Sequence, residues 1–215
     1  MRKLLPALAV LAGATIITAP ASATVHIDFL QGTAVSSLAG YTVIDNFNTT
    51  AGITGSNFQV QTAGNGNGAQ IPFADSQGSS YLTVLGGGTA SLALPTGTSG
   101  FAFEWGSLDT YNTLTIGLLG GSPITLVPHA GDLSTSPGDG DQLAADTNGT
   151  LLVWGDAGEV FTGLTLASGT NSFEIDNLAV KNAVPEASTW AMMIVGLGAV
   201  GMGMRRKRNV ALSFV

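Results

Sequence analysis

Short apolar runs recur about every ten residues between positions 24 and 180, and none keeps the 3.6-residue period of a helix. Several runs alternate: Leu114 and Ile116 would face one way, with Thr113 and Thr115 on the other side. Gly, Asn, Asp and Ser separate the runs. The pattern predicts strands at residues 25–30, 41–47, 57–61, 81–85, 101–105, 113–119, 124–127, 151–154, 160–167 and 172–180.

Many short strands at this spacing are typical of an all-β fold, an antiparallel β-sandwich of the jelly-roll kind. A Gly-rich β-helix and an irregular barrel are the alternatives. The chain has no fixed repeat that would support a β-helix. We therefore predict one β-sandwich body over residues 24–182.

The first 23 residues have the pattern of an export signal. Arg2 and Lys3 are followed by an apolar stretch over residues 4–17, and Ala21 and Ala23 fit the small-x-small rule for cleavage. The apolar stretch is shorter than the ~20 residues that a membrane span needs. The pattern predicts a signal peptide at residues 1–23, handled by the Sec export machinery and by signal peptidase.

A second uncharged stretch lies near the C-terminus, over residues 187–204. As a helix its 18 residues would measure ~27 Å, close to the thickness of a bilayer core. The stretch is followed by a basic cluster, which stays on the cytoplasmic side of a membrane. We expect a single transmembrane helix with the body outside the cell.

The residues around this stretch resemble a known sorting signal. Val184, Pro185, Glu186 and Trp190, the Gly-rich run and the basic cluster Arg205, Arg206, Lys207 and Arg208 are similar to the PEP-CTERM signal in its PEPxxWA variant. The resemblance covers residues 183–208. It implies recognition by an exosortase of a Gram-negative bacterium, cleavage near the Pro-Glu pair, and display or release at the surface of a cell that makes exopolysaccharide.

The chain departs from that family in two places. Ala187 replaces the second proline, so the helix could begin earlier and processing could be slower. A short tail, residues 209–215, follows the basic cluster. A simple tail anchor that is never processed is the alternative. Residues 101–114 and 173–180 also look like strands of uncharacterised PEP-CTERM surface proteins.

The charge distribution excludes several classes of function. Charged residues make up 10 % of the chain, and Cys is absent, which excludes disulfides and thiolate metal sites. Six of the seven cations lie at the two ends, so the body carries one Lys against thirteen acids, a charge of −12. Such a body repels nucleic acid, but it could attract divalent cations.

Calcium is the cofactor that the acidic residues suggest. Asp45 lies on an apolar strand face near the start of the body, and Asp176 and Asn177 lie where the alternation of the last strand changes phase. The phase change predicts a β-bulge. Because Ca²⁺ takes six to eight oxygen ligands, we predict a structural calcium held by Asp45, Asp176 and Asn177. Capping of strand ends by these side chains is the alternative.

Other candidate residues have simpler explanations. Glu104, Glu159 and Glu174 could supply a glycosidase pair, but two His and no G-x-S-x-G motif leave little support for a catalytic triad. Trp105, Tyr111 and Trp154 could stack on sugars, although core packing is the simpler assignment. Ice binding would need a flat threonine-rich face, and the pair Thr113 and Thr115 is too short to argue one.

Together these patterns predict an exported, surface-sorted protein without catalytic residues. Its β-sandwich body would act in adhesion or as a matrix component, with weak binding of polysaccharide such as exopolysaccharide. The alternative function is a secreted glycan-active hydrolase.

Overall fold

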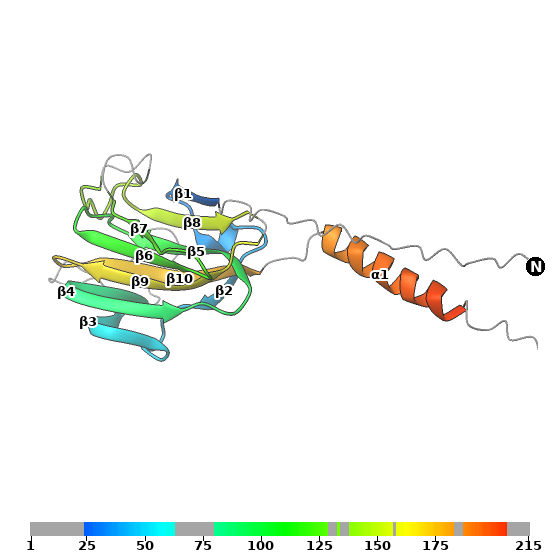
Figure 1. Ribbon diagram of the computed structural model, residues 1–215. Helices are drawn as coiled ribbons and strands as arrows, with labels where there is room; N and C mark the ends of the chain where they lie inside the picture. The colour runs from blue at the N-terminus through cyan, green and yellow to red at the C-terminus, as the bar shows by residue number, and fades with distance from the viewer. Residues whose placement is uncertain are drawn as a thin grey trace, which may run out of the picture.

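The computed structural model describes residues 24–62, 80–128, 133, 138–156, 158–182 and 187–205. Within these residues the chain forms ten strands, a short 3₁₀ turn and one helix (Figure 1). Every strand pairing is antiparallel. The strands are β1 (Val25–Gln31), β2 (Thr42–Asp45), β3 (Ile53–Gln61), β4 (Tyr81–Ala93), β5 (Thr98–Gly106), β6 (Asn112–Leu118), β7 (Ile124–Leu126), β8 (Gly149–Gly155), β9 (Phe161–Ser168) and β10 (Phe173–Asn182).

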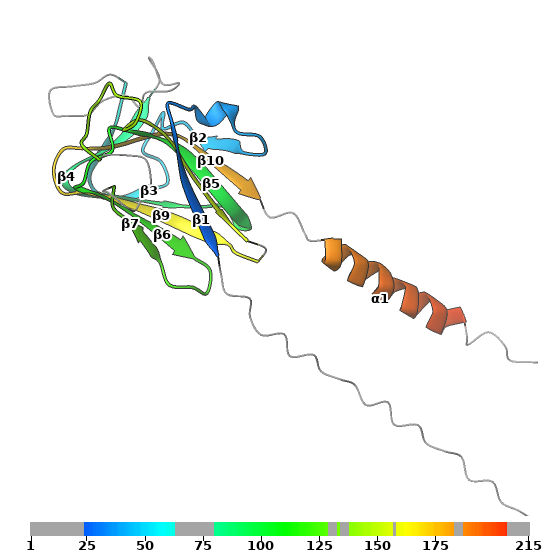
Figure 2. The same cartoon turned by 90° about the horizontal axis from the view of Figure 1, so that it is seen from above.

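The strands form two arms of one curled sheet. The first arm has the order β1-β8-β5-β10-β2, and the second has the order β3-β4-β9-β6-β7. A short pairing between β4 and β10 joins the arms. Figures 1 and 2 show the arms folding over each other. The prediction of an all-β antiparallel sandwich is confirmed, and the arrangement fits a jelly roll.

The alternation in the sequence decides which side chains enter the core. Leu114 and Ile116 of β6 are fully buried, whereas Thr113 and Thr115 point away from the core and are half-buried. The rings of Phe101 on β5 and Phe161 on β9 meet edge to face at 5.4 Å, which joins the two arms through their inner faces. Burial of these apolar side chains is the main term that stabilises the sandwich.

Strand β4 is much longer than the prediction of residues 81–85. Its first half pairs with β10 and its second half pairs with β9, so this strand passes from one arm to the other. Glycines allow the passage: Gly87 has a φ of 74°, and a Cβ on Gly88 would lie 2.5 Å from the carbonyl oxygen of Asn57. Glycines end the predicted strand in the sequence, but in the structure close backbone packing requires them and the strand continues.

The predicted bulge in the last strand is confirmed. The register of β10 against β5 shifts between Asp176 and Ala179, and Asn177 has a φ of 50°. Asn tolerates this left-handed conformation better than most residues. The bulge keeps Leu178 in the core while Ala179 packs against Val35 on the opposite face.

The helix α1 (Ala187–Arg205) lies apart from the sandwich in Figures 1 and 2. Among the residues that the structure describes, no helix has both the length and the apolar character needed to cross a membrane. The predicted transmembrane helix is therefore not confirmed. The predicted signal peptide with Ala21 and Ala23 lies outside the described residues, as does the tail at 209–215.

Candidate functional site

A row of hydroxyl side chains crosses the outer face of the second arm. The members are directly paired in register from strand to strand, and each lies on the side of its strand that faces away from the core. We call this the hydroxyl row: Thr54 on β3, Ser91 on β4, Thr165 on β9, Thr115 on β6 and Thr125 on β7.

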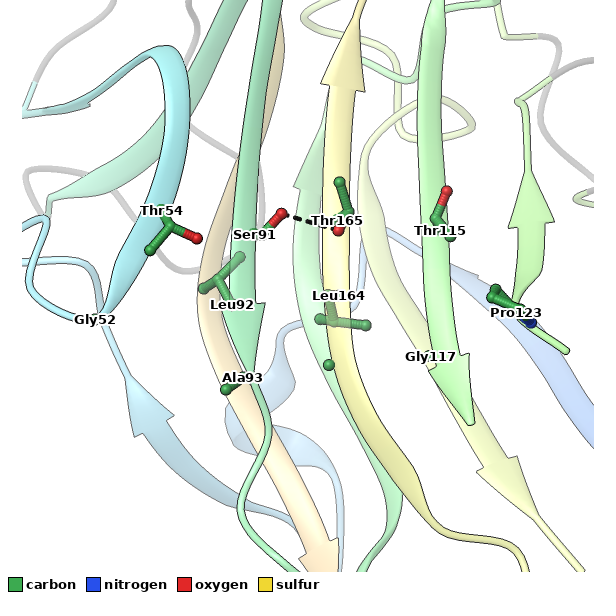
Figure 3. A pocket seen from close by; sticks show the side chains of 11 residues that line it. Gly52, Thr54, Ser91, Leu92, Ala93, Thr115, Gly117, Pro123, Leu164 and Thr165 are labelled. Carbon is green, nitrogen blue, oxygen red and sulfur yellow. Dashed lines mark hydrogen bonds between the residues drawn. The ribbon is translucent and has the colours of Figure 1, made fainter. Parts of the chain in front are cut away.

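The spacing of the hydroxyl row follows from sheet geometry. Neighbouring strands lie ~4.8 Å apart, so five paired residues extend over about 19 Å at right angles to the strands. Ser91 Oγ and Thr165 Oγ1 are hydrogen-bonded to each other at 2.9 Å, which fixes the centre of the row (Figure 3). All five side chains are half-buried or exposed, so solvent reaches them.

A shallow groove of about 480 Å³ runs along this row. Four members of the hydroxyl row line it, and Pro123 lies at the far side beside β7 (Figure 3). Glycines form part of the floor: a Cβ on Gly163 would lie 2.7 Å from the carbonyl oxygen of Leu92, and one on Gly117 would lie 2.6 Å from Thr162 Oγ1. Among the described residues, no charged side chain lines the groove.

The residues of the predicted calcium site lie on different faces of the sheet. Asp45 pairs in register with Leu178 of the core, and its Oδ1 accepts a hydrogen bond from the backbone N of Phe47 at 2.7 Å. Asp176 instead pairs with Glu104 on the other face, and its Oδ1 accepts from the backbone N of Asn177 at 2.7 Å. Both carboxylates thus make the backbone contacts of the capping alternative.

Asp176 belongs to a group of three carboxylates, with Glu104 and Glu174, that are fully buried. Glu104 accepts from the backbone N of Val35 at 3.1 Å, and Glu174 accepts from the hydroxyls of Ser107 and Ser172. In the part of the chain that the structure describes, no group of three or more His, Cys, Asp or Glu is arranged to hold a metal ion. The calcium site stays a prediction.

Burial and neighbouring carboxylates raise the pKa values of two tyrosines. Burial, together with the charge of Glu174, raises the pKa of Tyr81 to about 12. The pKa of Tyr111 is also raised, chiefly by burial and then by its hydrogen bond with Asp109. Both hydroxyls therefore stay protonated at neutral pH.

The glycosidase candidates do not meet at an accessible surface. Glu104 and Glu174 are fully buried, and Glu159 lies beside Gly155 at the β8–β9 turn. A glycosidase pair must contact the sugar from both sides of the scissile bond. This geometry gives no support to the hydrolase alternative.

The three aromatic candidates lie in three settings. Trp105 is fully buried and stacks on Phe173 with ring centroids 4.3 Å apart, as the core-packing assignment predicted. Tyr111 donates its hydroxyl to the carbonyl oxygen of Asn171 at 2.8 Å. Trp154 is half-buried on β8 and stacks on His26, which in turn lies 3.0 Å from Asp156. None of the three lines the groove.

Comparison with known families identifies a motif in the C-terminal segment. Residues 183–208 match the family model of the PEP-CTERM protein-sorting motif. The chain carries a PEP-CTERM protein-sorting motif. The motif implies processing by an exosortase in general and marks an exported, envelope-associated protein. The similarity of the body strands to those of other PEP-CTERM surface proteins stays a prediction.

The structure describes only part of the PEP-CTERM motif. Trp190 lies in the first turn of α1, and Arg205 is the last residue of that helix. The other motif residues, and the predicted cleavage site with them, fall outside the described residues: Val184, Pro185, Glu186, Arg206, Lys207 and Arg208.

Comparisons of the whole chain point to no established function. No curated protein is significantly similar in sequence. The fold is similar to a family 11 carbohydrate-binding module of Clostridium thermocellum at 14 % identity and a TM-score of 0.29, over 70 % of this chain and 99 % of that chain. It is also similar to TmCBM61 in complex with β-1,4-galactotriose, at 11 % identity and a TM-score of 0.32, over 73 % and 99 %. Likenesses of this size support no inference about what this chain binds.

The hydroxyl row was missed in the sequence because its members lie far apart along the chain. Within one strand, the alternation points only to Thr113 and Thr115 as part of a threonine face. The signal for the rest is the alternation of Thr or Ser with apolar residues in β4, β6 and β9. Which hydroxyls become neighbours depends on strand order and register, which alternation does not report.

Proposed function

We propose that this is an exported surface protein whose β-sandwich binds a neutral polysaccharide in the groove along the hydroxyl row. Binding there would serve adhesion or a structural role in an extracellular matrix. The hydroxyl row is the observation that carries the proposal. Export through the Sec machinery, removal of residues 1–23 by signal peptidase and sorting by an exosortase would bring the body to the surface.

The chemistry of the groove suits a ligand rich in hydroxyl groups. Each Thr or Ser hydroxyl both donates and accepts a hydrogen bond, as a sugar hydroxyl does. Thr54 and Thr115 flank the bonded pair of Ser91 and Thr165, so a chain lying across the strands would meet a hydroxyl at each strand it crosses. A few such bonds of modest net free energy fit weak binding that becomes effective through repetition along a polymer.

The charge of the body selects among polymers. The body contains no Lys or Arg between residues 24 and 180, and none of the described residues that line the groove is charged. An acidic polysaccharide or a nucleic acid would find no cation to pair with and would be repelled by the net charge. A neutral polysaccharide avoids this repulsion.

The threonine-rich face also bears on ice binding. The row supplies the hydroxyls that the sequence alone did not, but the surface is hollowed into a groove of about 480 Å³. A flat crystal face touches a hollow surface only at its rims, whereas a single polymer chain can lie inside it. The shape therefore favours a polymer as ligand.

Affinity electrophoresis of the purified full chain tests this function. The gels would contain neutral polysaccharides (dextran, β-glucan, galactan) or acidic ones (alginate, hyaluronan). We expect retardation by at least one neutral polymer and by no acidic one. The double variant Thr165→Val/Ser91→Ala should weaken binding about tenfold, since two hydroxyl contacts at about 0.5–1.5 kcal/mol each are lost.

The control is Thr96→Val, which removes an exposed hydroxyl in the β4–β5 turn that is not among the lining residues of the groove. It should bind like the parent chain. Absence of retardation by every neutral polymer, or equal weakening by the control, would contradict the proposed function. Inhibition of ice recrystallisation by the full chain that is lost in the double variant would favour ice as the ligand.

A further inference from the structure

A smaller cavity of about 120 Å³ adjoins the groove where β3 begins. The two cavities share Gly52, Leu92 and Ala93 as lining residues. The other walls of the smaller cavity include residues of β2 and β10, which belong to the first arm. A polymer that lies in the groove would therefore reach the smaller cavity at this end.

Among the described residues, Asp45 is the only charged one that lines either cavity. Its Oδ1 is held by the backbone N of Phe47 at 2.7 Å. Phe47 has a φ of 50° and a fully buried side chain, so the turn that orients the carboxylate is anchored in the core. An ionised carboxylate offers about four acceptor positions, and this one backbone contact leaves capacity for a ligand.

The wall around this carboxylate is apolar. Ile44 on β2 is 42 % exposed, and Ile53 and Leu178 also line the cavity. Hydrogen bonds to a charged group contribute more than those between neutral groups, and more again where water is partly excluded. A sugar unit matches this setting, because its hydroxyls can donate to the carboxylate while its C–H face contacts the isoleucine.

We infer that Asp45 is a specificity-determining residue, which accepts hydrogen bonds from hydroxyl groups of a neutral sugar unit seated in the smaller cavity. The inference rests on the proposed function and names the part of the site that selects the sugar. The negative charge also acts against carboxylated or sulfated units, since like charges repel at short range. Asp45 thus has a role that needs no metal ion.

The test compares Asp45→Asn with Asp28→Asn in the full chain, against the neutral polysaccharide that retards the parent most. Both variants remove one negative charge, but Asp28 lies exposed on β1 and lines neither cavity. Asn can keep the contact with Phe47 N, and Asp45→Ser provides a second uncharged variant that can do the same. We expect about tenfold weaker binding for both Asp45 variants and less than twofold change for Asp28→Asn.

Each other outcome overturns the inference in a distinguishable way. If Thr165→Val/Ser91→Ala weakens binding and the folded Asp45 variants do not, Asp45 has no part in a groove that still binds. If the Asp45 variants weaken binding only when calcium is present and not in chelator, Asp45 is a metal ligand. If chitosan binds better than neutral polymers and salt abolishes the effect of Asp45, the carboxylate selects amines. If no polysaccharide binds, the proposed function fails and this inference fails with it.

Discussion

Individual carboxylates in this protein lie in very different environments, although the residues around them in the sequence are similar. Asp45 is held at a turn beside a cavity, Asp176 is fully buried, and Asp109 lies half-buried near Asp139. Burial raises the pKa of Asp109 most, the charge of Asp139 raises it further, and a hydrogen bond with Tyr111 opposes the rise. The stability of the protein should therefore depend on pH through Asp109.

Asp109→Asn should stabilise the protein at neutral pH and have little effect below pH 3.8. Because the pKa of Asp109 is raised in the folded state, folding favours its protonated form, and its contribution to stability is lost as pH rises from the unfolded value of 3.8 through the folded value. Above that range the buried charge has a constant cost, which Asn removes. Melting temperatures of both chains at pH 3 and pH 7 check this; an equal difference at the two pH values would contradict it.

Strands β3 and β4 show how an element can depend on a single small residue. Gly55 of β3 has a φ of 143°, and a Cβ at this position would overlap the carbonyl of Thr89 on β4. The same strands supply Thr54 and Ser91 to the hydroxyl row. The close approach of their backbones is therefore a condition for the register of the site.

Gly55→Ala should lower the free energy of unfolding by roughly 3 kcal/mol, the upper end of the range for ordinary point mutations. Gly52→Ala is the matched control: Gly52 also has a positive φ, of 80°, but its Cβ would meet open space. It should cost about 1–2 kcal/mol from backbone conformation alone. Chemical denaturation of the two variants measures the difference, and equal losses would show that the contact with Thr89 does not matter.

On the scale of the whole molecule, the chain combines a β-sandwich body with a separate sorting segment. The strands end at Asn182, and the PEP-CTERM motif begins at the next residue. The hydroxyl row belongs to the second arm, whereas β10 leads into the motif from the first arm. Processing at the motif would therefore leave the residues of the groove intact.

Replacing Arg205, Arg206, Lys207 and Arg208 by Ala should mis-sort the full chain in a host with an exosortase. The four cations resist transfer across the bilayer and so fix the orientation of the motif during processing. Ala187→Pro should leave processing equal or faster, because proline keeps the preceding residue extended. Intact-mass analysis of surface-extracted protein checks both; a surface species that still contains Trp190 through Arg208 would identify an unprocessed anchor.

Local patterns in the sequence were sufficient for the class of fold and for the PEP-CTERM motif. Each of the ten predicted strands overlaps an observed strand, because alternation of apolar and polar residues is a local property. The bulge at Asn177 was visible as a change of phase in one strand, and the sorting motif as an ordered set of neighbouring residues. None of these required knowledge of which strands become neighbours.

Strand order and register were decided only by the tertiary structure, and with them the candidate site. Thr54 and Thr125 lie 71 positions apart in the sequence, yet they end one five-strand row because β4, β9 and β6 stand between them in register. The second half of β4 was missed because glycines that permit close packing resemble loop glycines when read alone. The bulge at Asn177 places Leu178, the partner of Asp45, on the core-facing side of β10, whereas Asp176 lies on the opposite side. Asp45 and Asp176 therefore lie on different faces, although each follows an Ile and precedes an Asn in the sequence. Which residues become neighbours depends on the pairing of strands that are distant in the sequence, and that pairing depends on the packing of the whole core.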